Sequence, residues 1–391
     1  MNKNKRQPNL WNDDKECSGC SACAAVCPVK AINFRYNSEG FLYPEVDSGK
    51  CIRCLKCERV CAYKKDTVTV IAEKRNTHIY AAKTRDENVL KSSSSGGMFT
   101  VLSDLFLDKN DMVVSCIYSY EKEAVVFSFF NNKSARDEAK GSKYIQAEAG
   151  NAFENIMAWL SQNPDRNMLI VGTGCQIAGL DLLLKEKKLR GRVLLVDLIC
   201  HGVASSKLWK DFAAKKEKEH GGRINYITFK NKRNGWENPS TFIKIKDEEL
   251  SIKPFADWFY MGWTLRESCY NCPYTKIDRN SDITIGDFWG IQNVMPDFYD
   301  KMGVSLVITH SEKGEIVFNE VKSKINFRES NRTECLQPRL IKPQVRPENR
   351  DDFWRDMNQN GMEYCEKIYF EYHRTTLKMK IKMAIKKIIK R

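Results

Sequence analysis

The residues with the clearest chemistry are eight cysteines between Cys17 and Cys61. They form two copies of one spacing, C-x2-C-x2-C-x3-C, in the segments CSGCSACAAVCP and CIRCLKCERVCA. A cubane iron-sulfur cluster needs four thiolates, and where two clusters are held together, each copy lends its last cysteine to the other cluster. The spacing therefore predicts two 4Fe-4S clusters, with the ligand sets Cys17, Cys20, Cys23 and Cys61 for one and Cys51, Cys54, Cys57 and Cys27 for the other.

Two other interpretations of these cysteines compete with clusters. Structural zinc also binds CxxC units, but it takes four ligands in two separated pairs, and three successive x2 gaps fit that pattern poorly. Disulfides would require an oxidising compartment, and the start of the chain has no apolar stretch typical of a secretory signal peptide. We therefore expect clusters in a protein of the reducing cytoplasm.

Four later cysteines lie at the ends of expected strands or in loops. Cys175 follows the apolar run LIVGTG, Cys200 follows RVLLVDLI, and Cys269 and Cys272 form a CxxC pair in ESCYNCPY. Four such thiols could hold a third cluster, although a CxxC pair is equally typical of zinc or redox sites and Cys175 could be an inert core thiol. His201 is the only histidine that we consider for chemistry, and ordering a loop by hydrogen bonding is an equally good role for it.

The stretch KSSSSGGMFTVLSDLF joins a polar turn directly to an amphipathic helix. Its glycines permit close backbone approach, and the helix N-terminus offers amides to an anion or a flavin edge. A serine-rich loop that merely caps the helix is the simpler alternative. No Walker sequence and no GxGxxG turn occurs, so a flavin would have to be held in another way.

The elements that must position these residues change character along the chain. A hairpin is expected around residues 37–40, between the two cysteine copies, and residues 62–77 resemble a linker. Strand-like and helix-like segments alternate from there on, which predicts a mixed α/β domain. The expected fold class is α+β, with a two-cluster ferredoxin-like domain at residues 1–66, an α/β domain at 77–330 and a separate C-terminal region at 331–391.

The net charge of +14 is concentrated at the C-terminus. Seven basic residues and no acidic one follow Thr375, so half of the excess lies in the last 17 residues, which does not favour a nucleic-acid partner. The apolar residues of this tail recur at helical spacing, at Leu377, Ile381, Ala384, Ile385 and Ile388. Such a helix suits the anionic inner face of a membrane, or else docks on its own domain or a partner. No run of 18 apolar residues predicts a membrane span.

Several motifs in order carry a family resemblance. KSSSSGGMFT, GSKYIQ, VGTGCQIAGL, DLICHGV, TFKNKRNGW, SCYNCPY and DITIGDFWG, after the double cysteine set, resemble the beta-subunit family of coenzyme F420 hydrogenases and dehydrogenases with an N-terminal ferredoxin module. The resemblance covers residues 15–330, and the last 60 residues carry none of it. It implies an α/β flavoprotein in which FAD lies beside an iron-sulfur cluster, and within the family it is similar to a bacterial subgroup associated with polysaccharide biosynthesis.

The resemblance also implies roles for particular residues. Cys175, Cys200, Cys269 and Cys272 would ligate the cluster nearest the flavin, Ser94, Ser95, Gly96 and Gly97 would line the flavin, and Lys143, Lys230 or Arg233 would approach its phosphates. The expected function is an oxidoreductase that passes electrons from a ferredoxin-type or other redox donor through the clusters to FAD and on to a small organic substrate. The alternatives are a non-catalytic electron-transfer subunit of a larger oxidoreductase, or a reductase that uses the deazaflavin coenzyme.

Overall fold

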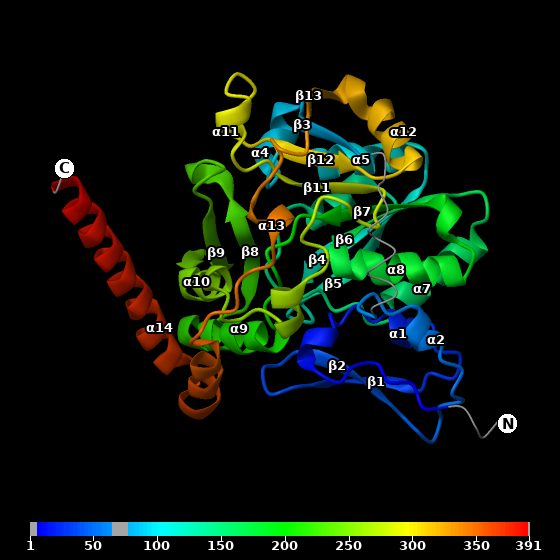
Figure 1. Ribbon diagram of the computed structural model, residues 1–391, viewed down its shortest axis with the longest axis horizontal. Helices are drawn as coiled ribbons and strands as arrows, with labels where there is room; N and C mark the ends of the chain where they lie inside the picture. Colours follow the sequence, from blue (N-terminus) through cyan, green and yellow to red (C-terminus); the bar gives the residue numbers. More distant parts are fainter. Residues whose placement is uncertain (1–5, 65–76, 390–391) are drawn as a thin grey trace.

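The computed structural model describes the backbone of residues 6–64 and 77–389, and side chains within these ranges up to residue 369. Most of the predicted linker, residues 65–76, lies outside the described residues. Three sheets organise the described chain: an N-terminal hairpin, an eight-stranded mixed sheet and a three-stranded antiparallel sheet (Figure 1). The predicted combination of a small cysteine-rich domain with a mixed α/β domain is confirmed.

The N-terminal module holds the two cysteine copies on either side of the predicted hairpin. Its elements are η1 (Asp14–Glu16), α1 (Ala22–Ala25), β1 (Ile32–Tyr36), β2 (Leu42–Val46) and α2 (Lys56–Arg59). The strands pair antiparallel, with Tyr36 opposite Leu42, and Asn37 closes the turn by accepting a hydrogen bond from the Phe41 amide. Both short helices begin after a residue in the left-handed region, Ser21 and Leu55. The two cysteine loops therefore have the same local backbone form.

The large sheet has the strand order β13-β3-β12-β11-β7-β6-β4-β5. Its central strands β4, β6, β7 and β11 run parallel and the outer ones antiparallel. The carboxyl ends of the parallel strands therefore meet at one edge, which is where α/β sheets bind ligands. The strands are β3 (His78–Thr84), β4 (Met112–Ser119), β5 (Ala124–Phe130), β6 (Met168–Thr173), β7 (Val193–Leu198), β11 (Ile283–Asp287), β12 (Ser305–Thr309) and β13 (Ile325–Ser330).

Helices cover both faces of this sheet because its central strands are apolar on both sides. In β6, Leu169 and Val171 belong to the core under α5 (Met98–Asp108) and α12 (Glu312–Val321). Met168 and Ile170 belong to the core under α7 (Ala152–Gln162) and α8 (Gly174–Glu186). Alternate side chains of a strand point to opposite faces, so one strand contributes to both cores. Short helices are α4 (Glu87–Ser92), α6 (Lys133–Arg136) and α11 (Ile291–Val294).

The three-stranded sheet lies beside the large one and completes the cavity described below. It consists of β8 (Ile224–Asn231), β9 (Ser240–Ile245) and β10 (Glu248–Ser251), and it is accompanied by α9 (Ser206–His220) and α10 (Lys253–Met261). Trp209, Phe229 and Phe255 join these elements through edge-to-face and tilted ring contacts. The aromatic cluster fixes the small sheet against the main domain.

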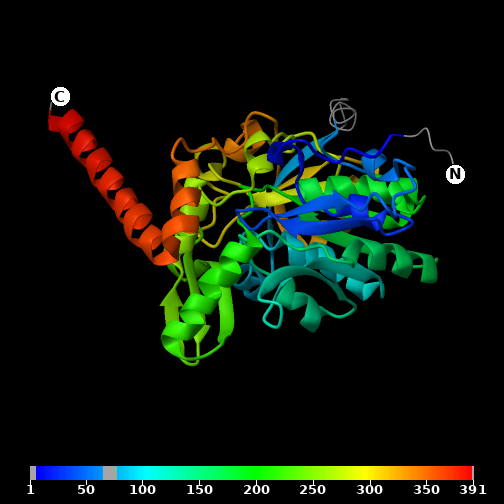
Figure 2. The same cartoon turned by 90° about the horizontal axis from the view of Figure 1, so that it is seen from below.

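The cysteine-rich module packs directly on the α/β domain rather than hanging from it. Figure 2 shows it against the helices at one side of the large sheet, and α1 contacts α8. Its residues Val26 and Phe41 belong to the same buried core as Ile177 and Leu180 of α8. The module is therefore a fixed layer of the molecule.

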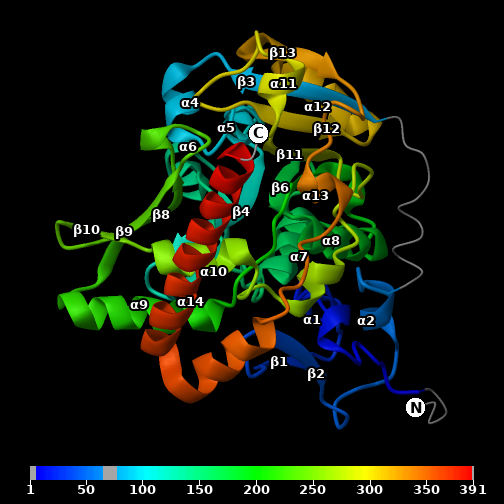
Figure 3. The same cartoon turned by 60° about the vertical axis from the view of Figure 1, so that its left-hand side comes forward.

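The C-terminal region leaves the body after a broken helix. It contains α13 (Pro338–Ile341) and α14 (Arg350–Ile389), and α14 is interrupted at Gly361, whose φ of +80° is not helical. The part of α14 beyond this break stands clear of the body in Figures 1 and 2, and in the view of Figure 3 it lies in front of the body. The predicted helical tail is confirmed through Ile389. Within residues 6–64 and 77–389, no helix combines the length and apolar composition needed to cross a membrane.

Candidate metal centres and the adjoining cavity

The structure brings Cys17, Cys20, Cys23 and Cys61 together, and we call these four the inward set. Burial raises the pKa of Cys20 to about 12, and the nearby thiols of Cys61, Cys17 and Cys175 raise it further. The pKa of Cys23 is raised in the same way, by burial and then by its cysteine neighbours. The fourth cysteine comes from the other copy of the motif, as the spacing predicts.

Cys51, Cys54, Cys57 and Cys27, the outward set, line one small hollow at the other end of the module. Val29 and Ile52 close its rim and are 36% and 46% exposed. The amide of Arg53 donates a hydrogen bond to Cys51 Sγ over 3.4 Å, and the amide of Ala31 donates to Cys27 Sγ over 3.3 Å. Such amide bonds to sulfur are one of the means by which proteins set cluster potentials.

Cys175, Cys200, Cys269 and Cys272, the later set, converge from three segments of the α/β domain. Cys175 is in the first turn of α8, Cys200 follows β7, and the other two flank the end of a 3-10 turn at Glu267–Asn271. Burial, followed by the thiols of the other three cysteines, raises the pKa of Cys269 well above its usual value. The sequence left a third cluster open, and the fold places its four predicted ligands side by side.

The chemistry of these donors fits iron-sulfur clusters. Burial raises the pKa of Cys200 to about 12 and that of Cys272 to about 11, so the bare thiols hold their protons at neutral pH. A bound polynuclear cation would offset the burial of the thiolates. Each set of four thiols then suits one cubane.

Three observations place the inward and later sets next to each other. The side chain of Ser18 offsets part of the burial-driven rise in the pKa of Cys175, and the side chain of Tyr63 does the same for Cys272, so both module residues lie beside these thiols. A Cβ on Gly179 of α8 would lie 2.8 Å from Cys20 Sγ, so only glycine lets the helix approach this cysteine. The two sets are therefore neighbours across the boundary between the module and the α/β domain.

Arg266 holds the same boundary from the side. Its guanidinium is fully buried and donates to the carbonyls of Cys17, over 2.7 Å, and Leu42, over 3.0 Å. It also donates to Gln146 Oε1 over 3.1 Å and lies 4.0 Å from the Tyr43 ring centroid. Burial raises the pKa of Cys175, and the positive charge of Arg266 offsets part of that rise. One buried cation thus stands beside both the inward and later sets.

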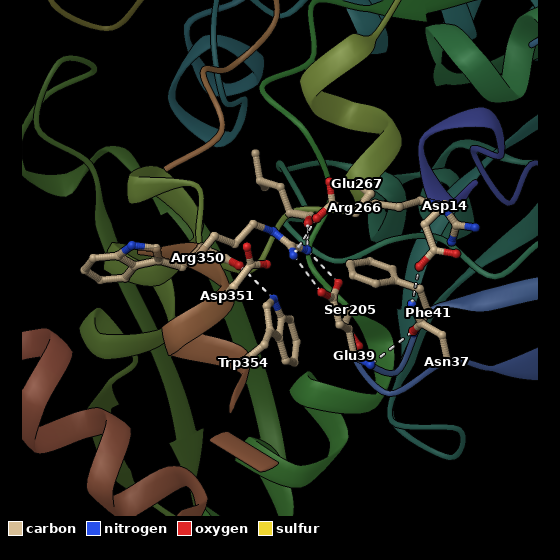
Figure 4. Close-up of polar contacts among 12 residues, drawn as sticks. Asp14, Asn37, Glu39, Phe41, Ser205, Arg266, Glu267, Arg350, Asp351 and Trp354 are labelled. Carbon is tan, nitrogen blue, oxygen red and sulfur yellow. Dashed lines mark hydrogen bonds and ion pairs between the residues drawn. The ribbon is translucent and has the colours of Figure 1, made fainter. Parts of the chain in front are cut away.

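A second buried arginine ties the C-terminal region to the same place (Figure 4). Arg350, at the start of α14, forms ion pairs with Glu39 in the β1–β2 turn over 2.5 Å and with Glu267 over 2.7 Å. Its Nε donates to the hydroxyl of Tyr270 over 2.8 Å. The module, the loop of the later set and the C-terminal region therefore share one buried ionic contact.

A cavity of about 660 Å³ opens at the carboxyl ends of β6, β7 and β11. Cys200 of the later set lines its wall, so the cavity adjoins that set directly. A smaller hollow of about 190 Å³ at the start of α5 shares several lining residues with it, among them Ser115, Ser142 and Ile199. The volume falls within the range usual for cofactor and small-molecule sites.

Five of the seven predicted flavin residues line these two spaces. Ser94, Ser95 and Gly97 line the smaller hollow, and Lys143 and Lys230 line the cavity. Gly96 lies beneath the turn, where a Cβ would overlap the Ala82 carbonyl oxygen. Arg233 lies outside both linings and pairs with Glu249 over 2.5 Å. The turn at Ser94–Gly97 therefore lies close to the carboxyl ends of the parallel strands, where the cavity opens.

The two lysines of the cavity are held differently. Burial lowers the pKa of Lys143 to about 8, and its ammonium donates to the carbonyls of Ala139 and Lys140 over 2.7 and 3.0 Å. Lys230 pairs with Asp287 over 2.5 Å and lies 5.0 Å from the Trp289 ring centroid. Lys143 therefore binds carbonyls of its own loop, whereas Lys230 binds the carboxylate of Asp287 at the end of β11.

Sequence reasoning missed several residues of the site. Asp287 also accepts a hydrogen bond from Trp236 Nε1 over 2.6 Å, and Gln337 Nε2 donates to the Asp287 carbonyl over 3.0 Å. Lys232 donates to the carbonyls of Leu90, Ser95 and Met302 and so fixes the serine-glycine turn. The quoted motifs TFKNKRNGW and DITIGDFWG contain Lys232, Trp236 and Asp287, but no motif marked Gln337 or Arg339, which also line the cavity.

Two buried polar atoms at the cavity lack a partner among the described residues. The hydroxyl of Thr100, in the first turn of α5, is 3% exposed and faces the smaller hollow without a hydrogen bond. His201 Nε2, beside Cys200, is also without one. Buried polar atoms are rarely left unpaired in native proteins, so both fit a polar ligand in the cavity.

Comparison with known proteins matches two parts of the chain to families. Residues 165–334 match the C terminus of the beta subunit in the coenzyme F420 hydrogenase/dehydrogenase family. The predicted family resemblance is confirmed. Residues 16–65 match the 4Fe-4S dicluster domain, in agreement with two clusters in the module. The beta-subunit match reaches beyond the predicted limit of residue 330 by a few residues. Membership in a polysaccharide-associated subgroup stays a prediction.

Relatives of this family and of its ferredoxin module are redox proteins by name. The F subunit of F(420)H(2) dehydrogenase from Methanosarcina mazei is 25% identical over 341 residues, covering 80% of this chain and 84% of its own. An iron-sulfur subunit of CoB--CoM heterodisulfide reductase from Methanocaldococcus jannaschii is 37% identical over 62 residues, 12% of this chain and 9% of its own. The xenon-derivatised F420-reducing [NiFe] hydrogenase complex from Methanosarcina barkeri matches with a TM-score of 0.44 at 14% identity, over 75% of this chain and 91% of that one.

Proposed function

We propose that the chain conducts single electrons through three 4Fe-4S centres to FAD in the cavity, where a small organic substrate is reduced or oxidised by two electrons. When bound, the clusters supply one-electron transfer and the flavin couples it to two-electron chemistry. The contact of the inward set with the later set, whose Cys200 lines the cavity, is the observation that carries this proposal.

The positions of the three cysteine sets support a fixed order. Cys23 of the inward set neighbours Cys57 of the outward set, and Cys20 neighbours Cys175 of the later set. Electrons would therefore pass from the outward to the inward set, then to the later set and the cavity. In this order every transfer is between adjacent centres.

The chain's own residues would bind and orient the flavin. The N-terminus of α5, with the unpaired hydroxyl of Thr100, suits a phosphate, because helix N-termini present free amides to anions. Lys143 and Lys230 bring positive charge to the same cavity. His201 and Tyr260 line the part nearest Cys200 and can donate or accept hydrogen bonds to a ring system.

Anaerobic reconstitution followed by iron, sulfide and flavin analysis tests the proposal. We expect about twelve irons and one FAD per chain, because each cubane holds four irons. About eight irons would eliminate the later set as a cluster site, and zinc in place of iron would overturn the proposal. Substituting Thr100→Val should weaken flavin retention while iron content stays unchanged.

A second candidate is an electron-transfer subunit that needs a partner protein and acts on the deazaflavin coenzyme, an alternative favoured by the name of the related dehydrogenase subunit. The reduced, reconstituted chain separates the two functions. Its flavin would be reoxidised by coenzyme F420 or another small acceptor if the chain is itself a reductase. It would stay reduced until a partner protein is added if the chain is only a subunit.

We also propose that the distal part of α14 binds an anionic membrane surface. From Thr375 to Ile389 it carries five basic and no acidic residues, which supports this, as does its position clear of the body (Figure 1). Sedimentation with phosphatidylcholine vesicles, with and without phosphatidylglycerol, should show binding only with the anionic lipid. A chain ending at residue 374 should not sediment, and equal sedimentation of both chains would refute the proposal.

A further inference from the structure

The outward cysteine set lies beneath a surface unlike the rest of the module. Between Cys51 and Cys61 the loop carries three basic residues and one acidic residue, whereas no charged residue occurs between Cys17 and Cys27. Ile52 and Val29 form an exposed apolar centre directly over the hollow that the outward set lines. We call this surface, formed by Val29, Lys30, Lys50, Ile52, Arg53 and Lys56, the outward face.

We infer that the outward face docks a small acidic electron-carrier protein, which delivers electrons to the outward set. The inference rests on the proposed function, because it requires a cluster at that set. One electron leaves the reduced carrier and enters the centre held by Cys51, Cys54, Cys57 and Cys27, with no bond made or broken. Two such events supply the two electrons that the substrate takes up in the cavity.

Access favours this face over other routes to the clusters. The inward set packs against α8 at Cys20 and against the buried Arg266 at the Cys17 carbonyl, so these two sides are closed to a protein partner. The outward set has a thin cover, since its rim residues Ile52 and Val29 are themselves exposed. A carrier that binds there lies next to the outward set, which the described part of the α/β domain does not enclose.

The charges around the face favour an acidic partner, because basic residues outnumber the nearby acids. Lys30 pairs with Glu154 over 3.4 Å, and Lys50 pairs with Asp47 over 3.2 Å. These acids partly offset the rim. The loop itself adds the positive charges of Arg53 and Lys56, and its one acid, Glu58, pairs with Arg6 over 2.5 Å. A small apolar patch ringed by charge is suited to brief electron-transfer encounters, whose interfaces are small and salt-sensitive.

Charge reversal on the reconstituted full-length protein tests the inference. The variant Arg53→Glu with Lys56→Glu should slow reduction by a reduced acidic ferredoxin about 10- to 100-fold at low salt, the usual size of electrostatic steering. The unaltered protein should lose most of this advantage as salt rises, because screening removes steering. The matched control Lys122→Glu with Lys218→Glu changes the charge equally at exposed positions elsewhere and should leave the rate unchanged.

A small neutral reductant, photoreduced deazariboflavin, separates a docking defect from a damaged cluster. It should reduce the variant and the unaltered protein at equal rates, and both should contain the same iron. The inferred docking surface would be overturned if ferredoxin reduced the variant as fast as the unaltered protein, while the iron content and the rate with the neutral reductant were also unchanged. That result would leave the proposed function untouched. Absence of iron at the outward set in the unaltered protein would instead overturn the proposed function.

Discussion

The two cysteine loops of the module have the same backbone and opposite surroundings. Gly19 and Arg53 occupy equivalent positions with φ of +67° and +56°, and each amide donates to the preceding cysteine, Cys17 or Cys51, over 3.4 Å. In the first loop the remaining positions are serine, glycine, alanine and valine, and the loop packs on α8. In the second they are larger or charged, and the loop faces solvent.

This difference shows which requirement fixes each residue. The spacing of cysteines and the left-handed turns serve the cluster, so both loops keep them. The side chains between the cysteines match what the loop contacts. The first loop packs on the protein core, and the second faces solvent or a partner. Glycine at position 19 is thus required by packing as well as by φ, whereas arginine is accepted at position 53 because the loop is exposed there.

The largest difference between the two loops is expected when the residue of one loop is placed in the other, at Gly19 and at Arg53. A Cβ at Gly19 would lie 2.7 Å from Gln146 Nε2 and 2.9 Å from Arg266 Nη1. Gly19→Arg should therefore lower the free energy of unfolding by about 3–5 kcal/mol, because it overpacks the boundary and places a second guanidinium against the buried Arg266. Arg53→Gly should change it by no more than about 0.5 kcal/mol. Denaturant unfolding of the reconstituted variants measures both, and equal effects would contradict the comparison.

Removing the positive charge of Arg266, beside the inward set, should have the next largest effect on stability. Arg266→Gln leaves the buried carbonyls of Cys17 and Leu42 without their donor, so we expect a loss of about 2–4 kcal/mol in the free energy of unfolding. The loss of positive charge should also make one midpoint in a redox titration more negative. Arg53→Gln is the control, and a midpoint that moves equally in both variants would show that Arg266 has no special electrostatic role.

Iron loss should distinguish the two sets without any substitution. A chelator with a mild oxidant should remove about four irons per chain several-fold faster than the rest, because the outward set has a thin, exposed cover. The variant Cys57→Ala should lack this fast phase in a time course of iron release. A single phase for all the iron in the unaltered protein would mean that the two sets are equally protected.

The smallest effect concerns a basic residue that is buried, in contrast to the exposed ones of the outward face. Burial lowers the pKa of Lys232 to about 8, below its usual 10.5. The unfolded chain then binds more protons than the native one between these values, so stability rises as pH increases from 8 to 10.5. Because three carbonyls that accept hydrogen bonds from its ammonium stabilise the charged form, we expect a rise of about 1–2 kcal/mol in the free energy of unfolding. Unfolding of Lys232→Met should lack this rise, and an identical pH profile would exclude Lys232 as its source.

Much of the fold was predictable because its signals are local. The helix at Met98–Asp108 and the hairpin at residues 37–40 both agree with their sequence patterns. The roles of Gln337 and Arg350 were not predictable. They act by contact with Asp287 and Glu39, which are distant along the chain, and neither stands in a recognisable motif. The C-terminal region, which carried no part of the resemblance, therefore completes the site.

The sequence by itself determined the two cysteine copies, the exchange of their last ligands and the family resemblance, because loop spacing and motif order are properties of the chain. Only the tertiary structure decided which loop faces inward, since that depends on α8 approaching Cys20 at Gly179 and on Arg266 closing the boundary. It also decided that the later cysteines converge and that one of them lines the cavity. Side chains from distant segments come into contact only when the sheet and its helices have packed, so no local sequence pattern predicts these contacts.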